Sequence, residues 1–265
     1  MLSFLIDALA GILAVVILVL NGISYCFERY FYKKVSIQPE KLAVVVTGCD
    51  SGFGEMISIK LASMGFHVIS GCLTQEGVDR MSSIVKLSLI CDVTNETDVA
   101  KLADSTEAYC KKKKCKVWAI VNNAGIADGG ALDWTGIHVW RRVMEVNFFG
   151  VVIVTRAFLP LLKRCPESRV INLSSMAGLL AGANIGPYFA SKHAVEGMAK
   201  ALREELRPWG IHVSNLNPAF MKTPILLNGL EAAKRSFESA PENITSQYDQ
   251  SFIQYHADMM TNTAE

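Results

Sequence analysis

Three residues in the second half of the chain have the types and spacing needed for proton transfer at an alcohol carbon. Tyr188 and Lys192 are four residues apart, which places both on one face of a helix. A free tyrosine has a pKa of about 10 and is a poor base at neutral pH, but a neighbouring ammonium group lowers that pKa. Ser175 can donate a hydrogen bond to a developing alkoxide or carbonyl oxygen. The set therefore predicts removal of a hydroxyl proton together with a hydride.

A glycine-rich turn, Thr47 to Gly54 (TGCDSGFG), precedes these residues in the chain. It lies between an apolar run at 42–46 and a helical pattern at 55–64. A dinucleotide pyrophosphate needs close approach of the backbone, together with the free N–H groups and positive dipole of a helix N-terminus. A glycine-rich turn alone is more often a plain strand-to-helix connection, but this context indicates a dinucleotide site.

Strand and helix patterns alternate along the rest of the chain. Helical periodicity covers 139–163 and 188–207, and a further helix-like stretch covers 226–239. Continuous apolar strands separated by helices are typical of a parallel sheet that is covered on both faces. The expected strands are 42–46, 67–72, 87–91, 117–121, 169–173 and 211–216.

The TGxxxGxG spacing, the NNAG sequence that ends at Gly125 and the YxxxK pair together resemble the short-chain dehydrogenase/reductase family. Singly, the catalytic candidates could be a packed tyrosine, a solvated lysine and a strand-end serine. Ser175 precedes Tyr188 by the family's 13 residues, which selects it over Ser174. The resemblance covers roughly 42–224. It implies an α/β domain at 37–265, a Rossmann-type doubly wound parallel sheet with helices on both faces.

The resemblance also implies roles for individual residues. Lys192 would bind the nicotinamide ribose, and Asn147 would be a fourth catalytic residue that holds a proton-relay water. Asp92 would bind the adenine amino group, although without the family a helix cap is an equally good interpretation. No metal is expected. The implied cofactor-binding residues are Gly48, Ser51, Gly52, Phe53, Gly54, Asp92, Asn123, Ala124, Gly125, Tyr188, Lys192 and Thr223.

NAD is the expected cofactor, with NADP the less favoured alternative. In the family an acidic residue at the end of the second strand selects NAD, whereas a basic residue there or in the glycine-rich turn selects NADP. Cys72 takes the acidic position here, and no arginine or lysine stands at Leu73, Thr74 or 49–51. Asp50 would repel a 2′-phosphate that lay nearby.

Within the family, the glycine-rich turn and the sequence GCLT at 71–74 look like the branch of retinol, hydroxysteroid and 3-hydroxybutyrate dehydrogenases. A membrane anchor fits lipophilic substrates, so an NAD-dependent dehydrogenase acting on a retinoid or steroid alcohol or ketone is expected. A 3-hydroxybutyrate-type dehydrogenase is the alternative, and homodimerisation is left open. A sugar-nucleotide epimerase fits less well, because its glycine spacing differs.

Two departures from the family pattern bear on whether the protein can catalyse the reaction. Ala219 follows Pro218 where the family has glycine, which removes freedom at positive φ beside the expected nicotinamide site. This branch normally continues well past Glu265, which leaves open whether the last strand and the substrate-side helices are complete. A non-catalytic cofactor-binding membrane protein is therefore the rival function, although the intact Ser175, Tyr188 and Lys192 argue against it.

Charge and cysteine usage narrow the remaining classes of function. The formal net charge of +1 gives no support to nucleic-acid binding, and the basic run 111–114 is interpreted as a solvated turn. The seven cysteines lie mostly in apolar runs without CxxC spacing. They predict buried reduced thiols rather than disulfides or a metal site.

Residues 1–36 are expected to form a membrane anchor and a short linker. From Leu2 to Tyr25 the sequence is almost wholly apolar, with Asp7 as its only formal charge, and about 20 such residues span a bilayer as a helix. A buried core helix and a cleaved signal peptide are the alternatives, but no basic n-region or small-x-small cleavage site is present. Basic residues follow the span at 29, 33 and 34. The positive-inside rule then places the domain on the cytosolic side of the endoplasmic reticulum or another intracellular membrane.

This topology predicts that protease added to sealed microsomes digests the domain that follows the anchor. Immunoblotting against the domain, with a lumenal protein as the protected control, measures it. A domain that survives until detergent is added would place it in the lumen and reverse the positive-inside interpretation.

Overall fold

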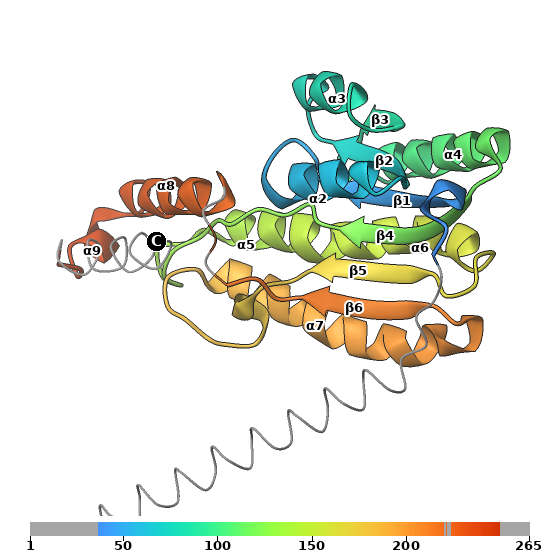
Figure 1. The fold of residues 1–265 in the computed structure, drawn as a ribbon. Helices are drawn as coiled ribbons and strands as arrows, with labels where there is room; N and C mark the ends of the chain where they lie inside the picture. The colour runs from blue at the N-terminus through green and yellow to red at the C-terminus, as the bar shows by residue number, and fades with distance from the viewer. Residues whose placement is uncertain (1–36, 220, 222–223, 250–265) are drawn as a thin grey trace, which may run out of the picture. The chain divides into compact units, whose positions relative to one another are not determined.

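Short apolar runs form six parallel strands in the part of the chain that the computed structural model describes, residues 37–219, 221 and 224–249. The sheet order is β3-β2-β1-β4-β5-β6 (Figure 1). The chain runs outward from β1 in both directions, so the switch point lies between β1 and β4, where such sheets bind ligands beyond the strand ends. The strands are β1 (Leu42–Thr47), β2 (His67–Cys72), β3 (Leu87–Ile90), β4 (Lys116–Asn122), β5 (Arg169–Leu173) and β6 (His212–Leu216).

Alternate residues of β1 contribute to two different cores. Ala43 and Val45 pack with side chains of α4, α6 and α7 on one face, whereas Val44 and Val46 pack with α2 and α3 on the other. The helices are α2 (Gly52–Ser63), α3 (Gln75–Ser82), α4 (Glu96–Lys113), α5 (Ile137–Met144), α6 (Gly150–Leu162), α7 (Gly186–Leu206), α8 (Pro224–Glu238) and α9 (Glu242–Thr245). Short 3₁₀ turns are η1 (Pro39–Lys41), η3 (Met176–Gly178) and η4 (Arg207–Trp209), and the π turn η2 (Glu145–Phe149) joins α5 to α6.

The fold confirms the predicted parallel sheet, but the sheet is not covered on both faces along its whole width. Helices cover both faces of β1 and β2, but at the β6 edge Val213 is buried while its neighbours His212 and Ser214 are exposed. No seventh strand occurs within the described ranges. Helix α8 lies beyond the carboxyl ends of the strands (Figure 1). Its residues Ile225 and Gly229 line a cavity.

One local prediction is wrong. The basic run is not a turn, because Lys111 to Lys113 form the last turn of α4 and Lys114 is its left-handed C-cap. All four side chains are exposed, as expected, and cations at a helix C-terminus interact favourably with its dipole.

The described cysteines are free and buried, in agreement with the prediction of reduced thiols: Cys49, Cys72, Cys91, Cys110, Cys115 and Cys165. The predicted membrane span lies outside the described residues. Within them, Ile137–Leu162 is long and apolar enough to cross a bilayer by length and composition. This stretch supplies Val154 and Phe158 to the core, so it is a helix of the domain interior.

Candidate active site

The glycine-rich turn forms a tight cradle between β1 and α2. Gly48 and Gly52 both have positive φ, +67° and +61°, which favours glycine. A Cβ on Gly54 would lie 2.2 Å from the Gly48 carbonyl oxygen, so this position is restricted by close backbone approach. Ser51 precedes the helix in an extended conformation and makes no side-chain cap. The first N–H groups of α2 are therefore available to an anion.

The NNAG loop holds this cradle from the neighbouring strand. Asn123 Nδ2 donates to the carbonyl oxygens of Thr47 (2.8 Å) and Gly48 (3.0 Å), and the Asn123 N–H donates to Thr47 Oγ1 (3.1 Å). Thr47 also accepts from the Ala124 N–H (3.2 Å). Thr47 therefore helps to hold the site together. It is the first residue of the glycine-rich turn, but it was not among the predicted site residues.

Asp50 reaches from the glycine-rich turn to the end of β2. Its carboxylate accepts from the N–H groups of Leu73 (2.7 Å) and Thr74 (2.9 Å) and from Thr74 Oγ1 (2.7 Å). A Cβ on Gly77 would lie 2.4 Å from Asp50 Oδ1, so α3 packs directly on it. A carboxylate from another loop therefore lies where the acidic residue is missing from β2.

A cation that the sequence did not indicate lies at the same corner. Arg80, from α3, donates to the Asp50 backbone carbonyl and pairs with Glu55 at 3.2 Å and with Glu76 at 3.8 Å. Because two carboxylates already flank this guanidinium, it does not present an unpaired positive charge.

Asp92 lines the cavity and also caps the turn before α4. Its Oδ1 accepts from the Thr94 N–H (2.9 Å) and Thr94 Oγ1 (2.8 Å), whereas Asn95 is the N-cap of the helix itself. Both interpretations of Asp92 therefore have a structural basis, and the adenine contact stays a prediction.

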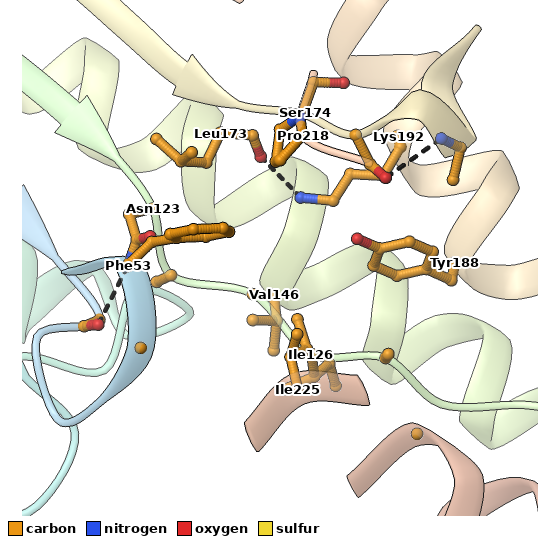
Figure 2. Close-up of a pocket in the computed structure, with 18 of the residues that line it drawn as sticks. Phe53, Asn123, Ile126, Val146, Leu173, Ser174, Tyr188, Lys192, Pro218 and Ile225 are labelled. Atoms are coloured by element: carbon orange, nitrogen blue, oxygen red, sulfur yellow. Dashed lines mark hydrogen bonds between the residues drawn. The ribbon is translucent and has the colours of Figure 1, made fainter. Parts of the chain in front are cut away.

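The serine, tyrosine and lysine predicted to be catalytic line one cavity at the carboxyl end of β5. Figure 2 shows Tyr188 and Lys192 in this cavity. Ser175 is extended, and its Oγ accepts from the Ala177 N–H at 3.1 Å. Tyr188 lies in the first turn of α7, near enough to Ser175 for that hydroxyl to lower the pKa of the tyrosine. One turn on, Lys192 is buried and its Nζ donates to the Leu173 carbonyl at 2.7 Å, 5.6 Å from the centre of the Tyr188 ring.

The protonation of this pair differs from the sequence expectation. Burial raises the pKa of Tyr188 above its ordinary value, and the Ser175 hydrogen bond only partly opposes this. Burial also lowers the pKa of Lys192 to about 8. The expectation of a lowered tyrosine pKa is wrong for this structure, because desolvation disfavours the charged form of each group and outweighs the influence of its neighbours.

Asn147 is buried in the π turn, where the helix is widened. Its Oδ1 accepts from the Ile126 N–H (2.8 Å), and its Nδ2 donates to the Ile126 carbonyl (2.9 Å) and Ser191 Oγ (3.0 Å). A Cβ on Gly125 would lie 3.3 Å from Asn147 Oδ1 and 3.7 Å from Lys192 Nζ. Asn147 therefore ties the NNAG loop to α7, and π turns often occur at functional sites.

These residues surround a cavity of about 1130 Å³. Of the predicted residues, Gly54 and Asn147 lie behind its wall, and Thr223 is outside the described residues. Beyond Tyr188 the wall is mainly apolar, formed by Ile126, Met176, Leu180, Ile185, Phe189 and Ile225. No group of three or more potential metal ligands occurs in the described part of the chain.

The model of the family described as short chain dehydrogenase matches residues 42–233. This match covers more than half of the chain and includes the glycine-rich cradle and the serine, tyrosine and lysine. The chain belongs to the short-chain dehydrogenase family.

Three relatives illustrate its place in that family. The chain is 36% identical to the mitochondrial D-beta-hydroxybutyrate dehydrogenase of Bos taurus, over 80% of this chain and 64% of the relative. It is 32% identical to 17-beta-hydroxysteroid dehydrogenase type 6 of Bos taurus (91% and 77% covered) and 34% identical to retinol dehydrogenase 5 of Mus musculus (89% and 75%). The chain thus spans just under two thirds of the length of the hydroxybutyrate dehydrogenase.

Solved structures of short-chain dehydrogenases have the same fold. A 3-ketoacyl-(acyl-carrier-protein) reductase from Brucella melitensis complexed with NADH superposes with a TM-score of 0.67 at 30% identity, over 76% of this chain and 84% of that one. A short-chain dehydrogenase/reductase from Burkholderia phymatum in complex with NAD gives 0.68 at 28% identity, over 86% and 80%.

In this short-chain dehydrogenase, Lys192 makes the free energy of unfolding depend on pH. The unfolded chain protonates this lysine up to the ordinary pKa of 10.5, whereas the folded protein does so only up to about 8. Between these values the unfolded state binds more protons, so the stability contributed by this group rises with pH. The rise is about 2 kcal/mol from pH 8 to 9.5.

Urea unfolding of wild type and Lys192→Met across this pH range measures the rise in the free energy of unfolding. We expect this rise in wild type and not in the variant. Lys200→Met, an exposed lysine on the same helix, is the matched control and should keep it. Equal pH dependence in wild type and Lys192→Met would show that burial does not shift the pKa of this lysine.

Proposed function

We propose that the chain is a membrane-anchored oxidoreductase that transfers hydride between NAD(H) and a lipophilic alcohol or ketone, such as a retinoid or a steroid. One observation carries this proposal. Ser175, Tyr188 and buried Lys192 meet in one cavity whose other half is the glycine-rich cradle. A proton-transfer group and a dinucleotide site in the same cavity are what alcohol oxidation requires.

The cradle fits a dinucleotide in shape and in polarity. The uncapped N-terminus of α2 and the two glycines at positive φ leave backbone donors open toward the cavity. Gly48, Ser51, Gly52 and Phe53 would hold the pyrophosphate side, Asp92 the adenine, and Asn123, Ala124 and Gly125 the nicotinamide side, with Lys192 at its ribose. Gly54 would act from behind, by allowing the turn to close, and Thr223 would bond the nicotinamide amide.

The chain's own residues provide the proton chemistry. NAD, when bound, accepts the hydride or, when reduced, donates it. Tyr188 takes the hydroxyl proton during oxidation and returns it during reduction, while the Ser175 hydroxyl bonds the substrate oxygen. Lys192 is protonated below a pKa of about 8, and its positive charge favours the Tyr188 phenolate. Asn147 bonds both α7 and the residue that follows the NNAG loop. It therefore keeps Tyr188 and Lys192 in position relative to that loop.

Asp50 supports NAD over NADP. Its carboxylate lies at the end of β2, and like charges oppose each other strongly when water is partly excluded. The solved relatives from Brucella melitensis and Burkholderia phymatum are complexes with NADH and NAD, which agrees with this choice.

The wall beyond Tyr188 supports a lipophilic substrate over a small hydroxy acid. It is mostly aliphatic and aromatic, and Arg142, one of its few charged members, pairs with the buried Asp128. A substrate carboxylate would have to compete with that ion pair. Retinol and steroid dehydrogenases among the relatives favour the same choice, while the hydroxybutyrate dehydrogenase keeps 3-hydroxybutyrate as the alternative. The predicted anchor would hold the domain on the cytosolic side of an intracellular membrane, where such alcohols partition.

The first test separates an enzyme from a non-catalytic cofactor-binding protein. Purified protein with NAD and a panel of retinoid and steroid alcohols plus 3-hydroxybutyrate should reduce NAD, followed by absorbance. Tyr188→Phe should lower kcat by about 10²- to 10⁴-fold, the usual contribution of a positioned acid or base. Tyr109→Phe removes a hydroxyl of α4 that is bonded to His67 of β2; it is the matched control and should keep activity. Equal background rates in wild type and Tyr188→Phe would reject the proposal that the protein is an enzyme.

The second test concerns the cofactor. Wild type should bind NADH more tightly than NADPH, and Asp50→Asn should shift the affinity ratio toward NADPH by at least about tenfold, because the charge that opposes a 2′-phosphate is gone. Asp79→Asn removes an exposed charge from α3 outside the cavity and should leave the ratio unchanged. Fluorescence titration of each variant measures both affinities. Tighter NADPH binding by wild type would refute the role of Asp50.

A further inference from the structure

Helix α7 carries a third titratable residue in line with Tyr188 and Lys192. Glu196 follows the lysine by four residues, so the three side chains lie along one face of the helix at successive turns. Glu196 is half-buried beneath the loop that carries Ser175 and takes no part in the proton chemistry described above.

Glu196 is connected to Ser175 through one amide group. Asn217 Nδ2 donates to Glu196 Oε1 at 2.6 Å, and the same nitrogen donates to the Ser175 backbone carbonyl at 3.1 Å. The next residue, Pro218, accepts from the Met176 N–H at 3.1 Å. The segment after β6 is thus bonded to the serine loop at two adjacent points, and Glu196 fixes the amide that makes the first of them.

The serine loop also rests directly on this part of α7. A Cβ on Gly178 would lie 2.8 Å from Ser174 Oγ, 3.0 Å from Glu196 Cγ and 3.0 Å from the Lys192 carbonyl oxygen. Such distances leave no room for a side chain, so the loop and the helix are in van der Waals contact. A small change in the position of Glu196 would therefore be passed to the loop.

A directed series of amides ends beside the same carboxylate. The three strands β4, β5 and β6 are in register at Asn122, Asn172 and Asn215. Asn122 Nδ2 donates to Asn172 Oδ1 (2.9 Å), and Asn172 Nδ2 donates to Asn215 Oδ1 (3.0 Å). Since the Asn215 oxygen is used in this way, its Nδ2 donor is the end left for Glu196.

The protonation of Glu196 agrees with this arrangement. Desolvation by burial raises its pKa, but hydrogen bonds from Asn217, Ser174 and Asn215 outweigh it, with help from the charge of Arg203. The net result is a pKa below the ordinary value. Ser174 Oγ and Asn215 Nδ2 are buried, and neither has an acceptor at full hydrogen-bond geometry among the described residues. A carboxylate has two oxygens that can accept from these donors, whereas an amide has only one.

We propose that Glu196 is a positioning residue, whose carboxylate holds Asn217 and through it keeps Ser175 in place to bond the substrate oxygen. This inference rests on the proposed function for its effect on turnover, although the contacts themselves do not depend on it. A glutamine at this position has one acceptor oxygen for the facing donors, and its own NH₂ group opposes the remaining ones. The serine loop would shift, and misplacement of a reacting group by about 1 Å can lower the rate by about 100-fold.

A double-mutant cycle tests whether Glu196 acts through Ser175. Glu196→Gln should lower kcat by about 10- to 100-fold and leave the dissociation constant of NADH within about twofold, since it does not touch the cradle. In a Ser175→Ala background the same change should alter kcat less than about twofold, because the group being positioned is gone. Glu205→Gln, an exposed glutamate on the same helix, is the matched control and should keep wild-type kcat.

A wild-type kcat in Glu196→Gln, or an equal loss in both backgrounds, would overturn the proposal. Amide hydrogen exchange covers the case in which wild type turns over no alcohol and the proposed function itself fails. Ala177 and Gly178 donate to Ser175 Oγ and to its carbonyl oxygen, so their exchange should be faster in Glu196→Gln than in Glu205→Gln. Equal exchange in the two variants would reject the positioning role even then.

Discussion

The burial of one ammonium group constrains the rest of the site. Lys192 is 4% exposed, and its Nζ donates to the carbonyl oxygen of Leu173, the last residue of β5. A buried charge is costly unless it is paired and hydrogen-bonded, and here the result is a pKa of about 8 rather than 10.5. Helix α7 must therefore lie where it meets the end of β5. That contact also places Tyr188 beside Ser175 and Glu196 beneath the serine loop.

The cofactor side depends on a different constraint, the close approach of two loops. Gly48 and Gly54 lie so close to neighbouring backbone that a side chain at either would collide, and Asn123 bonds the turn from the next strand. This packing leaves the α2 terminus open. The charge at the far corner comes from the same turn, because Asp50 extends across to the end of β2. In the proposed function, shape and charge selectivity for the dinucleotide would thus arise from eight consecutive residues and their contacts.

The sequence was informative wherever the structure depends on local pattern. Predicted strands at 67–72 and 169–173 agree with β2 and β5, and the predicted strand at 42–46 lies within β1. Residues 43–46 are all buried, and strands buried on both faces appear as continuous apolar runs. Helix α2 begins at Gly52, earlier than the predicted 55, because glycines weaken a helical pattern. Arg80 and Asn217 could not be anticipated, since they meet Asp50 and Glu196 only through the tertiary fold. The pKa shifts of Tyr188 and Lys192 were equally hidden, because they follow from burial.

The direction of those shifts bears on the direction of the proposed reaction. A tyrosine with a raised pKa is protonated at neutral pH and suits the donation of a proton to a ketone oxygen. Oxidation needs the phenolate instead, which the Lys192 cation favours below pH 8 and the neutral amine above it does not. Raising the pH makes the tyrosine easier to ionise but removes the charge that stabilises its anion. Two buried groups on one helix face therefore oppose each other. Ser175 lowers the Tyr188 pKa whatever the charge of the lysine, so the position of the serine matters at either pH.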